Sequence, residues 1–346
     1  MLAELTARLA AVPELAPDQI TRAVELLTEE TVGVEEKAEF LAALARRGET
    51  AAEIAGLAGE LLARATPLPV PPSLRAGDIL DVCGTGGDRL GTFNISTTVA
   101  LVCAAAGVVV AKHGNRAITS RSGSADVLEA LGVPVDLSPA EAAASLERHG
   151  FAFLFAPRFH PAFRHLAPAR KLCAERGQRT VFNFLGPLLN PARPTVQLLG
   201  VSRSELVEPM ARTLQALGLR RAMVVSGEVP GSGQLDELSP LGVNTVAEFY
   251  QDRGFSVTAW SPSDLPLQPA TLADLAGGSA AENAAIIRGI LAGEDRGPRR
   301  DAVLLNAGAA LFLAGRARSI AEGWDLAGRV IDSGRAREKL AHLSRH

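Results

Sequence analysis

The stretch DVCGTGGDRLGTFNISTTVA, residues 81–100, decides the interpretation of this 346-residue sequence. It predicts a short apolar strand over Asp78–Cys83, a glycine-rich turn, and an apolar helix over Asn94–Gly107. Glycines permit positive φ angles and let backbone amides approach a ligand closely. Consecutive amides in such a turn, followed by the free N–H groups of a helix start, form an anion site. The stretch therefore predicts either a phosphate cradle or only a glycine turn with a capped helix.

The glycine pattern differs from two well-known nucleotide-binding loops. No Gly-Lys-Ser or Gly-Lys-Thr closes it, as a Walker loop requires. Its glycine spacing and the long gap before the helix do not fit the dinucleotide fingerprint. The sequence thus indicates neither of these motifs.

A second polar loop favours the phosphate interpretation. A strand predicted over Val108–Ala111 runs into KHGNR, residues 112–116, and then into a helix predicted over Ser122–Gly132. Lys112, Arg116 and Arg121 bring three positive charges to the end of this strand. Ligands of open α/β sheets bind at the carboxyl ends of strands. Two such loops on successive strands predict a site for a polyanion.

The rest of the chain predicts an α/β fold with a small N-terminal helical domain and a larger α/β domain with a mainly parallel central sheet. A proline-rich linker over residues 65–77 separates the two parts. Apolar residues at helical spacing predict four N-terminal helices, at Leu2–Ala11, Pro17–Glu30, Val34–Arg47 and Ala51–Ala65. Further strands are predicted at Phe151–Phe155, Val196–Val201 and Ala222–Ser226, and further helices at Ser204–Leu217, Ala280–Leu291, Asp301–Leu313 and Ile320–Ser333.

Composition excludes several other classes of protein. Hydrophobic residues make up 47% of the chain, which is too many for a disordered protein. The net charge of −3 and an aromatic content of 4% argue against a nucleic-acid partner. The longest apolar stretch, Val99–Ala111, is too short to span a bilayer, and the start of the chain does not resemble a signal peptide. The three widely spaced cysteines indicate a reducing cytoplasm, and no membrane partner is expected.

A further feature has the chemistry of a polyanion site. Asp236 and Glu237 lie in the loop Gly227–Ser239, after the strand predicted at Ala222–Ser226. Adjacent carboxylates suit Mg²⁺, which takes oxygen ligands and shares phosphate oxygens, but taken alone the pair favours a solvated acidic surface.

Four blocks of the sequence carry a resemblance to a known family. They are GTGGD…TFNIST, KHGNR…SGSADVLEALG, FLFAPRFHPAF…APAR and RTVFNFLGPLLNP. In order and spacing they closely resemble the anthranilate phosphoribosyltransferases, from the N-terminal helices to about Glu248. This resemblance implies transfer of a phosphoribosyl group from phosphoribosyl pyrophosphate to anthranilate in tryptophan biosynthesis. It also implies Mg²⁺ as cofactor and a homodimer formed through the helical domain.

The resemblance also implies domains and site residues. The helical domain would cover residues 1–66, joined by helices from about 161–190, and the α/β domain residues 78–346. Anthranilate would contact Gly84, Asn115 and Arg170, and Mg²⁺ would be held by Ser96, Asp236 and Glu237. The phosphoribosyl donor would contact Gly84, Gly87, Asp88, Thr92, Asn94, Ile95, Ser96, Thr97, Lys112, His113, Gly114, Asn115, Arg116, Ser120 and Ser124.

The implied reaction needs no covalent nucleophile and no general base from the protein. The aromatic amine of anthranilate is already neutral at pH 7, so departure of pyrophosphate from the ribose is the difficult step. His160 and His165 are accordingly expected to pack rather than to transfer protons. His113 is expected to shape its loop or line the ligand site.

Two departures from the family pattern and three rival functions stay open. The segment from Arg170 to Arg179 and the one before Asp236 are both longer than is typical of the family. The longer metal loop is therefore expected to be more mobile. The rivals are a pyrimidine-nucleoside phosphorylase, a relative that uses another aromatic amine, and a noncatalytic protein. The KHGNR loop and the acidic pair favour the transferase.

Overall fold

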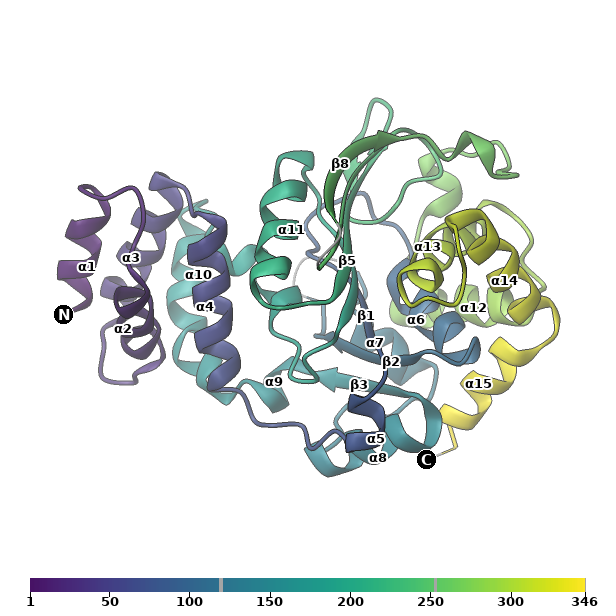
Figure 1. Cartoon of the computed structure of the whole chain (residues 1–346), viewed down its shortest axis with the longest axis horizontal. Helices are drawn as coiled ribbons and strands as arrows, with labels where there is room; N and C mark the ends of the chain where they lie inside the picture. Colours follow the sequence, from purple (N-terminus) through teal and green to yellow (C-terminus); the bar gives the residue numbers. More distant parts are fainter. Residues whose placement is uncertain (118–120, 252–253, 346) are drawn as a thin grey trace.

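The computed structural model describes residues 1–117, 121–251 and 254–345. A helical part at the N-terminal end adjoins a larger part in which helices cover a twisted sheet (Figure 1). The predicted fold class, a small helical domain beside a larger α/β domain, is confirmed. No helix in the described part of the chain is both long and apolar enough to cross a membrane.

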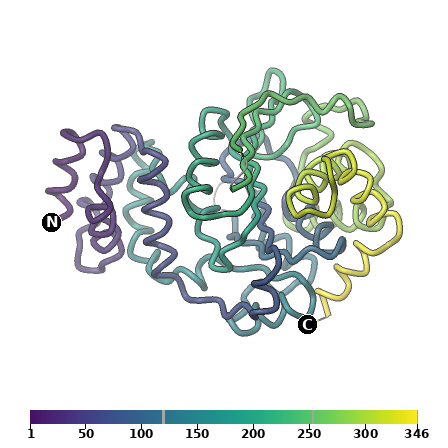
Figure 2. The backbone as a smooth tube through the Cα atoms, viewed as in Figure 1, coloured from purple at the N-terminus to yellow at the C-terminus, as the bar shows by residue number. Residues whose placement is uncertain are grey.

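The helical part combines the first four helices with a later one. Its helices are α1 (Leu2–Leu9), α2 (Pro17–Thr28), α3 (Val34–Arg47), α4 (Ala51–Ala63) and α10 (Ala167–Glu175). The chain leaves this part after α4 and returns to it as α10, as the tube in Figure 2 shows. Cys173 of α10 lies against α3, where its thiol donates to the Ala38 carbonyl at 3.6 Å. Residues from both segments share one apolar core.

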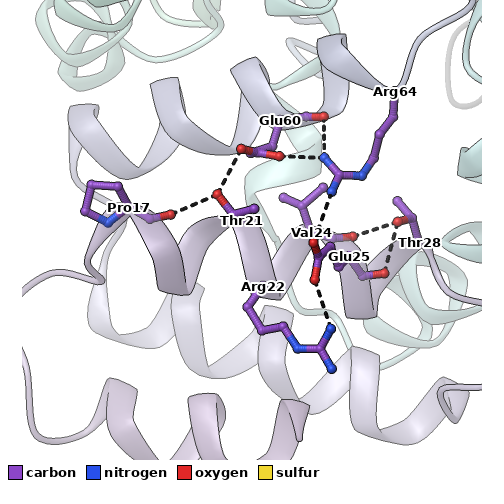
Figure 3. Close-up of polar contacts among 8 residues, drawn as sticks. All are labelled: Pro17, Thr21, Arg22, Val24, Glu25, Thr28, Glu60 and Arg64. Carbon is purple, nitrogen blue, oxygen red and sulfur yellow. Dashed lines mark hydrogen bonds and ion pairs between the residues drawn. The ribbon is translucent and has the colours of Figure 1, made fainter.

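Polar contacts tie α2 to α4 along one side of the helical part (Figure 3). The Thr21 hydroxyl of α2 donates to Glu60 of α4 at 2.9 Å. Arg64 pairs with Glu60 on its own helix and lies 3.9 Å from Glu25 of α2. Partly exposed pairs of this kind contribute little stability, at most about 1 kcal/mol each. The packing of the helical part therefore depends mainly on its apolar core.

The central sheet has the strand order β3-β2-β1-β4-β5-β7-β8, with β6 paired to β5. The first five in this order run parallel, and β6, β7 and β8 are antiparallel. The last three were not predicted from the sequence. The strands are β1 (Ile79–Gly84), β2 (Val109–Gly114), β3 (Phe151–Phe155), β4 (Val196–Gly200), β5 (Arg221–Val229), β6 (Gly233–Leu235), β7 (Asn244–Tyr250) and β8 (Gly254–Trp260).

Helices cover the sheet and include one that is apolar on every side. Ten of the eleven residues of α6 (Ile95–Ala105) are buried, because it packs between the sheet and α13. The helix α15 was not predicted, and residues 65–77 are extended apart from the short α5. The remaining helices are α5 (Pro72–Arg75), α7 (Ser124–Ala130), α8 (Pro139–His149), α9 (Ala156–Phe159), α11 (Val207–Ala216), α12 (Ala280–Leu291), α13 (Pro298–Leu313), α14 (Ile320–Asp332) and α15 (Arg335–Leu343).

The parallel strands bring the predicted loops to one edge of the sheet. β1 lies between β2 and β4, so the loops that follow these three strands are neighbours. The last residue of β1, Gly84, is paired in register with the last residue of β4, Gly200. The glycine loop and the KHGNR loop therefore meet at the carboxyl edge, where ligands of such sheets bind.

Candidate active site

The glycine loop after β1 is shaped by left-handed backbone. Gly86 and Gly87 have φ angles of 73° and 86°, a region that favours glycine. The Gly86 amide donates to Oδ2 of Asp236 at 2.6 Å, and the Thr85 amide to the Gly200 carbonyl at 2.9 Å. Asp88 turns one carboxylate oxygen toward the Leu90 amide, and its other oxygen is buried with no hydrogen-bond partner. In this structure one backbone amide of the loop thus holds a carboxylate of the same chain.

Three glycines let the acidic segment cross the ends of the strands. A Cβ on Gly84 would lie 2.1 Å from Oδ2 of Asp236, and one on Gly200 would lie 1.6 Å from the Asp236 carbonyl oxygen. A Cβ on Gly227, in β5, would lie 2.5 Å from the Ser239 amide nitrogen. No larger residue fits these contacts unless the backbone moves. The predicted metal ligands can therefore lie here only because Gly84, Gly200 and Gly227 have no side chains.

Asp236, which is half-buried, and the buried Glu237 form an acidic pair with an excess of negative charge. Burial is the main cause that raises the pKa of both carboxyl groups. The charge of Asp88 raises the pKa of Asp236 further, and the charge of Asp236 raises that of Glu237. Lys112 is a nearby positive charge that opposes the effect at Glu237. A cation placed beside the pair would lower both pKa values.

The N-terminus of α6 completes this side of the site. Oε1 of Glu237 accepts the Ser96 amide at 3.1 Å, which places the carboxylate at the positive end of the helix dipole. Nζ of Lys112 donates to the Val82 carbonyl at 2.6 Å and lies 3.3 Å from the Ser96 hydroxyl. The Thr97 hydroxyl is buried and has no hydrogen-bond partner. Strand β2, helix α6 and the acidic segment thus converge at Ser96.

This donor set fits Mg²⁺ that is shared with a phosphorylated ligand. Among the described residues, no three Asp, Glu, His or Cys side chains gather as a metal site. The predicted set instead has two carboxylates and the hydroxyl of Ser96, which lies beside the amide that holds Glu237. Mg²⁺ is usually bound through one or two protein carboxylates, with phosphate and water as its other ligands. The excess of negative charge on this pair agrees with such a site.

The KHGNR loop is ordered by its own polar contacts. Arg116 pairs with Asp126 at 3.1 Å and with Glu129 at 2.8 Å, so its charge is already compensated within the protein. The Asn115 carbonyl accepts the Ser124 hydroxyl at 3.3 Å. A Cβ on Gly114 would lie 2.3 Å from that hydroxyl. The roles predicted for Asn115, Gly114 and Ser124 stay predictions, and Ser120 lies outside the described residues.

Arg170 lies in a separate group of rings. Its guanidinium stacks 5.3 Å from the Phe182 ring and makes no hydrogen bond or ion pair with any described residue. Burial lowers the pKa of this arginine. Among the described residues, no acidic side chain therefore pairs with Arg170, which belongs to the predicted anthranilate site.

The rings form a continuous path from β2 to Arg170. His113 lies 5.3 Å from His160, His160 lies 5.2 Å from Phe163, and Phe163 lies 5.8 Å from Phe182. Nε2 of His160 is 2.8 Å from the Leu189 carbonyl, as expected for a packing role. Burial lowers the pKa of His113 to about 3, and its Nε2 has no partner. His113 is therefore held neutral, and it packs edge-on against His160.

The two longer segments have local explanations. The segment from Arg170 to Arg179 runs through the exposed end of α10 to a turn at Gly177, which has a φ of 67°. The segment before Asp236 forms the antiparallel β5–β6 hairpin, in which Val229 is paired with Gly233.

Some residues that support the site were not found from the sequence. Gly200 is one, because a single glycine at the end of a strand carries no signal of what crosses it. Asp81 and Asn190 are two others. Asn190 donates to Oδ2 of Asp81 at 2.9 Å and to the Ala111 carbonyl at 2.7 Å, and so joins β1 to β2 beneath the loops. Asn190 belongs to the block RTVFNFLGPLLNP, one of the four that carry the family resemblance.

Two family profiles cover most of the chain. Residues 76–337 match the α/β domain of a glycosyl transferase family, and residues 3–65 match the helical bundle domain of the same family. The anthranilate phosphoribosyltransferase of Thermomicrobium roseum is 51% identical over 88% of this chain and 85% of its own length. That of Petrotoga mobilis is 46% identical over 95% of this chain and 92% of its own length.

Solved structures agree with these sequence matches. The anthranilate phosphoribosyltransferase of Thermus thermophilus superposes with a TM-score of 0.88 at 44% identity, covering 98% of each chain. The Saccharomyces cerevisiae enzyme in complex with phosphoribosyl pyrophosphate and Mg superposes with a TM-score of 0.85 at 30% identity. That match covers 99% of this chain and 96% of the yeast chain.

Proposed function

This chain belongs to the anthranilate phosphoribosyltransferase family, and we propose how its residues divide the work of that reaction. The protein transfers the phosphoribosyl group of phosphoribosyl pyrophosphate to anthranilate, giving N-(5-phosphoribosyl)anthranilate and pyrophosphate, in tryptophan biosynthesis. It uses Mg²⁺, which is present with the donor in the yeast relative. The observation that carries the division of roles is the contrast between the acidic pair, whose carboxyl pKa values are raised, and Arg170, which has no acidic partner among the described residues.

The donor is assigned to the edge formed by the glycine loop and α6. Asp236, Glu237 and the Ser96 hydroxyl would hold Mg²⁺, which when bound neutralises charge on the departing pyrophosphate. The Gly86 amide donates to Asp236, and the donor's pyrophosphate would compete with this carboxylate for the amide. The Thr97 hydroxyl and Lys112 supply further positive or hydrogen-bonding groups. These fixed donors stabilise charge where it develops on the leaving group.

Anthranilate is assigned to the space between His113 and Arg170. The Arg170 guanidinium would bind the carboxylate of anthranilate, because a fork of N–H donors matches two carboxylate oxygens. The rings of Phe163 and Phe182 line the path beside it. His113 is held neutral by burial, so it would not repel or protonate the aromatic amine. The amine can then approach C1 of the ribose without help from a general base.

One assay tests these assignments together. Purified protein is mixed with magnesium, phosphoribosyl pyrophosphate and anthranilate, and the loss of anthranilate fluorescence is followed. We expect the loss to require magnesium and to stop when a chelator is added in excess. Parallel reactions with phosphate and thymidine should give no phosphorolysis. Thymidine cleavage without loss of anthranilate would contradict the proposal.

We also propose a homodimer through the helical part and a cytoplasmic location. Met1 and Val34 are 77% and 41% exposed, and the Ala3 amide donates to Glu36, so α1 and α3 begin side by side. All three cysteines are free and buried, which agrees with a reducing compartment. Light scattering should give twice the chain mass, and Val34→Glu should lower it, whereas Val257→Glu on β8 should not.

A further inference from the structure

A buried asparagine from the C-terminal helices reaches the donor edge. Asn283 lies in the first turn of α12 and is 2% exposed. Its side-chain amide donates to Oδ1 of Asn94, at the start of α6, at 2.8 Å. The two residues are 189 positions apart in the chain. None of the roles proposed above involves Asn283.

The backbone fixes the direction of this contact at both ends. The Gly278 N–H can only donate, and it does so to Oδ1 of Asn283 at 2.7 Å. The amide nitrogen of Asn283 must therefore point to Asn94. Asn94 in turn donates its own amide nitrogen to the Ser122 carbonyl, which can only accept, at 3.1 Å. A backbone donor and a backbone acceptor thus leave one orientation for both side-chain amides.

This orientation explains an unusual helix start. Asn94 is the N-cap of α6, yet its side chain makes no capping hydrogen bond. The amide of Ser96, which an N-cap side chain commonly accepts, donates to Glu237 instead. Asn94 is thus free to join the glycine loop to the loop that ends at Ser122, while the helix start serves the acidic pair.

The backbone segment before Asn283 also contacts the exit of the glycine loop. The Phe93 amide donates to the Leu275 carbonyl at 3.0 Å, and the Gly277 amide to the Gly91 carbonyl at 2.8 Å. A Cβ on Gly277 would lie 2.6 Å from Cα of Phe93, so the two segments are in direct backbone contact. The segment from Leu275 to Asn283 therefore supports the exit of the glycine loop through both backbone and side chain.

We propose that Asn283 is a positioning residue for the phosphoribosyl donor, which acts by orienting the amide of Asn94 and tying the two donor loops together. This inference rests on the donor site proposed above. Loss of the contact should weaken binding of the donor, because Asn94 and the Ser122 segment would no longer hold one arrangement. Binding of anthranilate should change little, because its proposed site at Arg170 and the rings is built from other elements than α12.

The central experiment is a double-mutant cycle between Asn283→Ala and Asn94→Ala, read out as KM for each substrate. We expect Asn283→Ala to raise the donor KM by about tenfold, which is the loss of roughly one net hydrogen bond. In the Asn94→Ala background the same change should have less than about half that effect on a logarithmic scale. The anthranilate KM should stay within about twofold.

Two further variants separate positioning from packing. Asn283→Asp keeps the volume and the acceptor for Gly278 but turns an oxygen toward Oδ1 of Asn94, so we expect it to raise the donor KM at least as much as alanine does. Ser279→Ala removes the N-cap of α12, where Ser279 accepts the Glu282 amide, without touching Asn94. It should lower the melting temperature and leave the donor KM unchanged.

The outcomes are distinct. Three results would each overturn the inference. The effects in the cycle could be additive, or Asn283→Asp could behave as wild type. Alternatively, Ser279→Ala could raise the donor KM as much as Asn283→Ala does. Failure of the donor-site assignment is visible separately, because Asn94→Ala alone would then leave the donor KM unchanged. If Asn283→Ala does not fold, the cycle is run with Asn283→Asp.

Discussion

The donor side and the acceptor side of the site are built from different kinds of chemical group. On the donor side, backbone amides, a helix N-terminus and three carboxylates are fixed by hydrogen bonds to one another. On the acceptor side, Arg170 is held by a ring stack, and His113, His160, Phe163 and Phe182 touch mainly through their faces and edges. One region is organised by charge and the other by shape.

The difference follows from what each substrate needs. The donor loses a highly charged leaving group, so its site must supply positive charge and fixed dipoles that need no rearrangement during the reaction. The acceptor brings a neutral amine on a flat ring and one carboxylate. A cavity lined by rings with a single cation suffices for that ligand. Changes to the groups that would hold Mg²⁺ should therefore lower kcat strongly, and those on the acceptor side should mainly raise one KM.

Removing the acidic pair should have the largest effect. In the double variant Asp236→Asn and Glu237→Gln the two side chains keep their size but lose the charges that would hold Mg²⁺. We expect kcat to fall roughly 10³-fold, as for loss of a metal contribution of several kcal/mol. Activity should also lose its dependence on magnesium concentration, measured by titrating the metal into the fluorescence assay.

A matched control for that variant is Glu228→Gln. Glu228 lies on β5 in the same hairpin, and it is exposed. Its replacement should leave both kcat and the magnesium response unchanged. If the double variant keeps its turnover and its magnesium response, the assignment of these residues as metal ligands is contradicted.

Substitution of Gly200 should have the next largest effect and tests the placement of the pair without removing it. In Gly200→Ala the new Cβ would collide with the Asp236 carbonyl, so the acidic segment must move away from β4. We expect kcat to fall about 100-fold, the cost of displacing fixed groups by roughly an ångström. Gly59→Ala in α4 is the control, because no heavy atom lies within 4 Å of the place its new methyl group would occupy. Equal activity of the two variants would show that the acidic segment does not depend on a close contact with Gly200.

Replacement of Arg170 tests the acceptor side. We expect Arg170→Ala to raise the anthranilate KM by about 10- to 100-fold, the range of a charge-assisted hydrogen bond. The donor KM should change less than about threefold. Lys171→Ala is the matched control, because Lys171 is exposed and pairs with Glu175 on the same helix. A rise confined to the donor KM would remove Arg170 from the anthranilate site.

The same contrast explains what the sequence could predict. The donor loops are local, because glycines, a helix start and basic residues stand within about 45 consecutive positions, and their chemistry can be read without a structure. The acceptor group is assembled from β2, α10 and two irregular segments, which have no common spacing. Arg170 was therefore reached only through family resemblance, and its ring neighbours Phe163 and Phe182 were not found.

The fold shows a similar limit. The buried parallel strands and the apolar helix α6 were predicted because their residues are almost all apolar. Strand β8 was missed, because most of it is exposed and its residues alternate only weakly. Gly200 and Asn283 were missed because each depends on a partner far away in the chain, Asp236 in one case and Asn94 in the other.

The smallest predicted effect concerns the response of the acceptor side to acid. Burial, then the neighbouring charge of His160, lowers the pKa of His113 to about 3, below its ordinary value of 6.5. The unfolded chain therefore takes up a proton below pH 6.5 that the folded protein excludes, and folding stability is lost as pH falls from 6.5 toward 3. Lowering the pH from about 6.5 to about 5.5 should cost about 1 kcal/mol through this group.

The measurement is urea unfolding of wild type and His113→Asn at pH 7.5, 6.5 and 5.5. Asp81 acts in the opposite direction, because burial raises its pKa to about 6 and its protonation stabilises the folded state as pH falls. The informative quantity is therefore the difference between the two proteins, which removes the part that Asp81 contributes to both. That difference should shift by about 1 kcal/mol in favour of the variant between pH 6.5 and 5.5. His342→Asn, at an exposed position on α15, should show no such shift. A difference that is constant with pH would mean that His113 is accessible to protons, and that the acceptor side is less dry than its packing against His160 indicates.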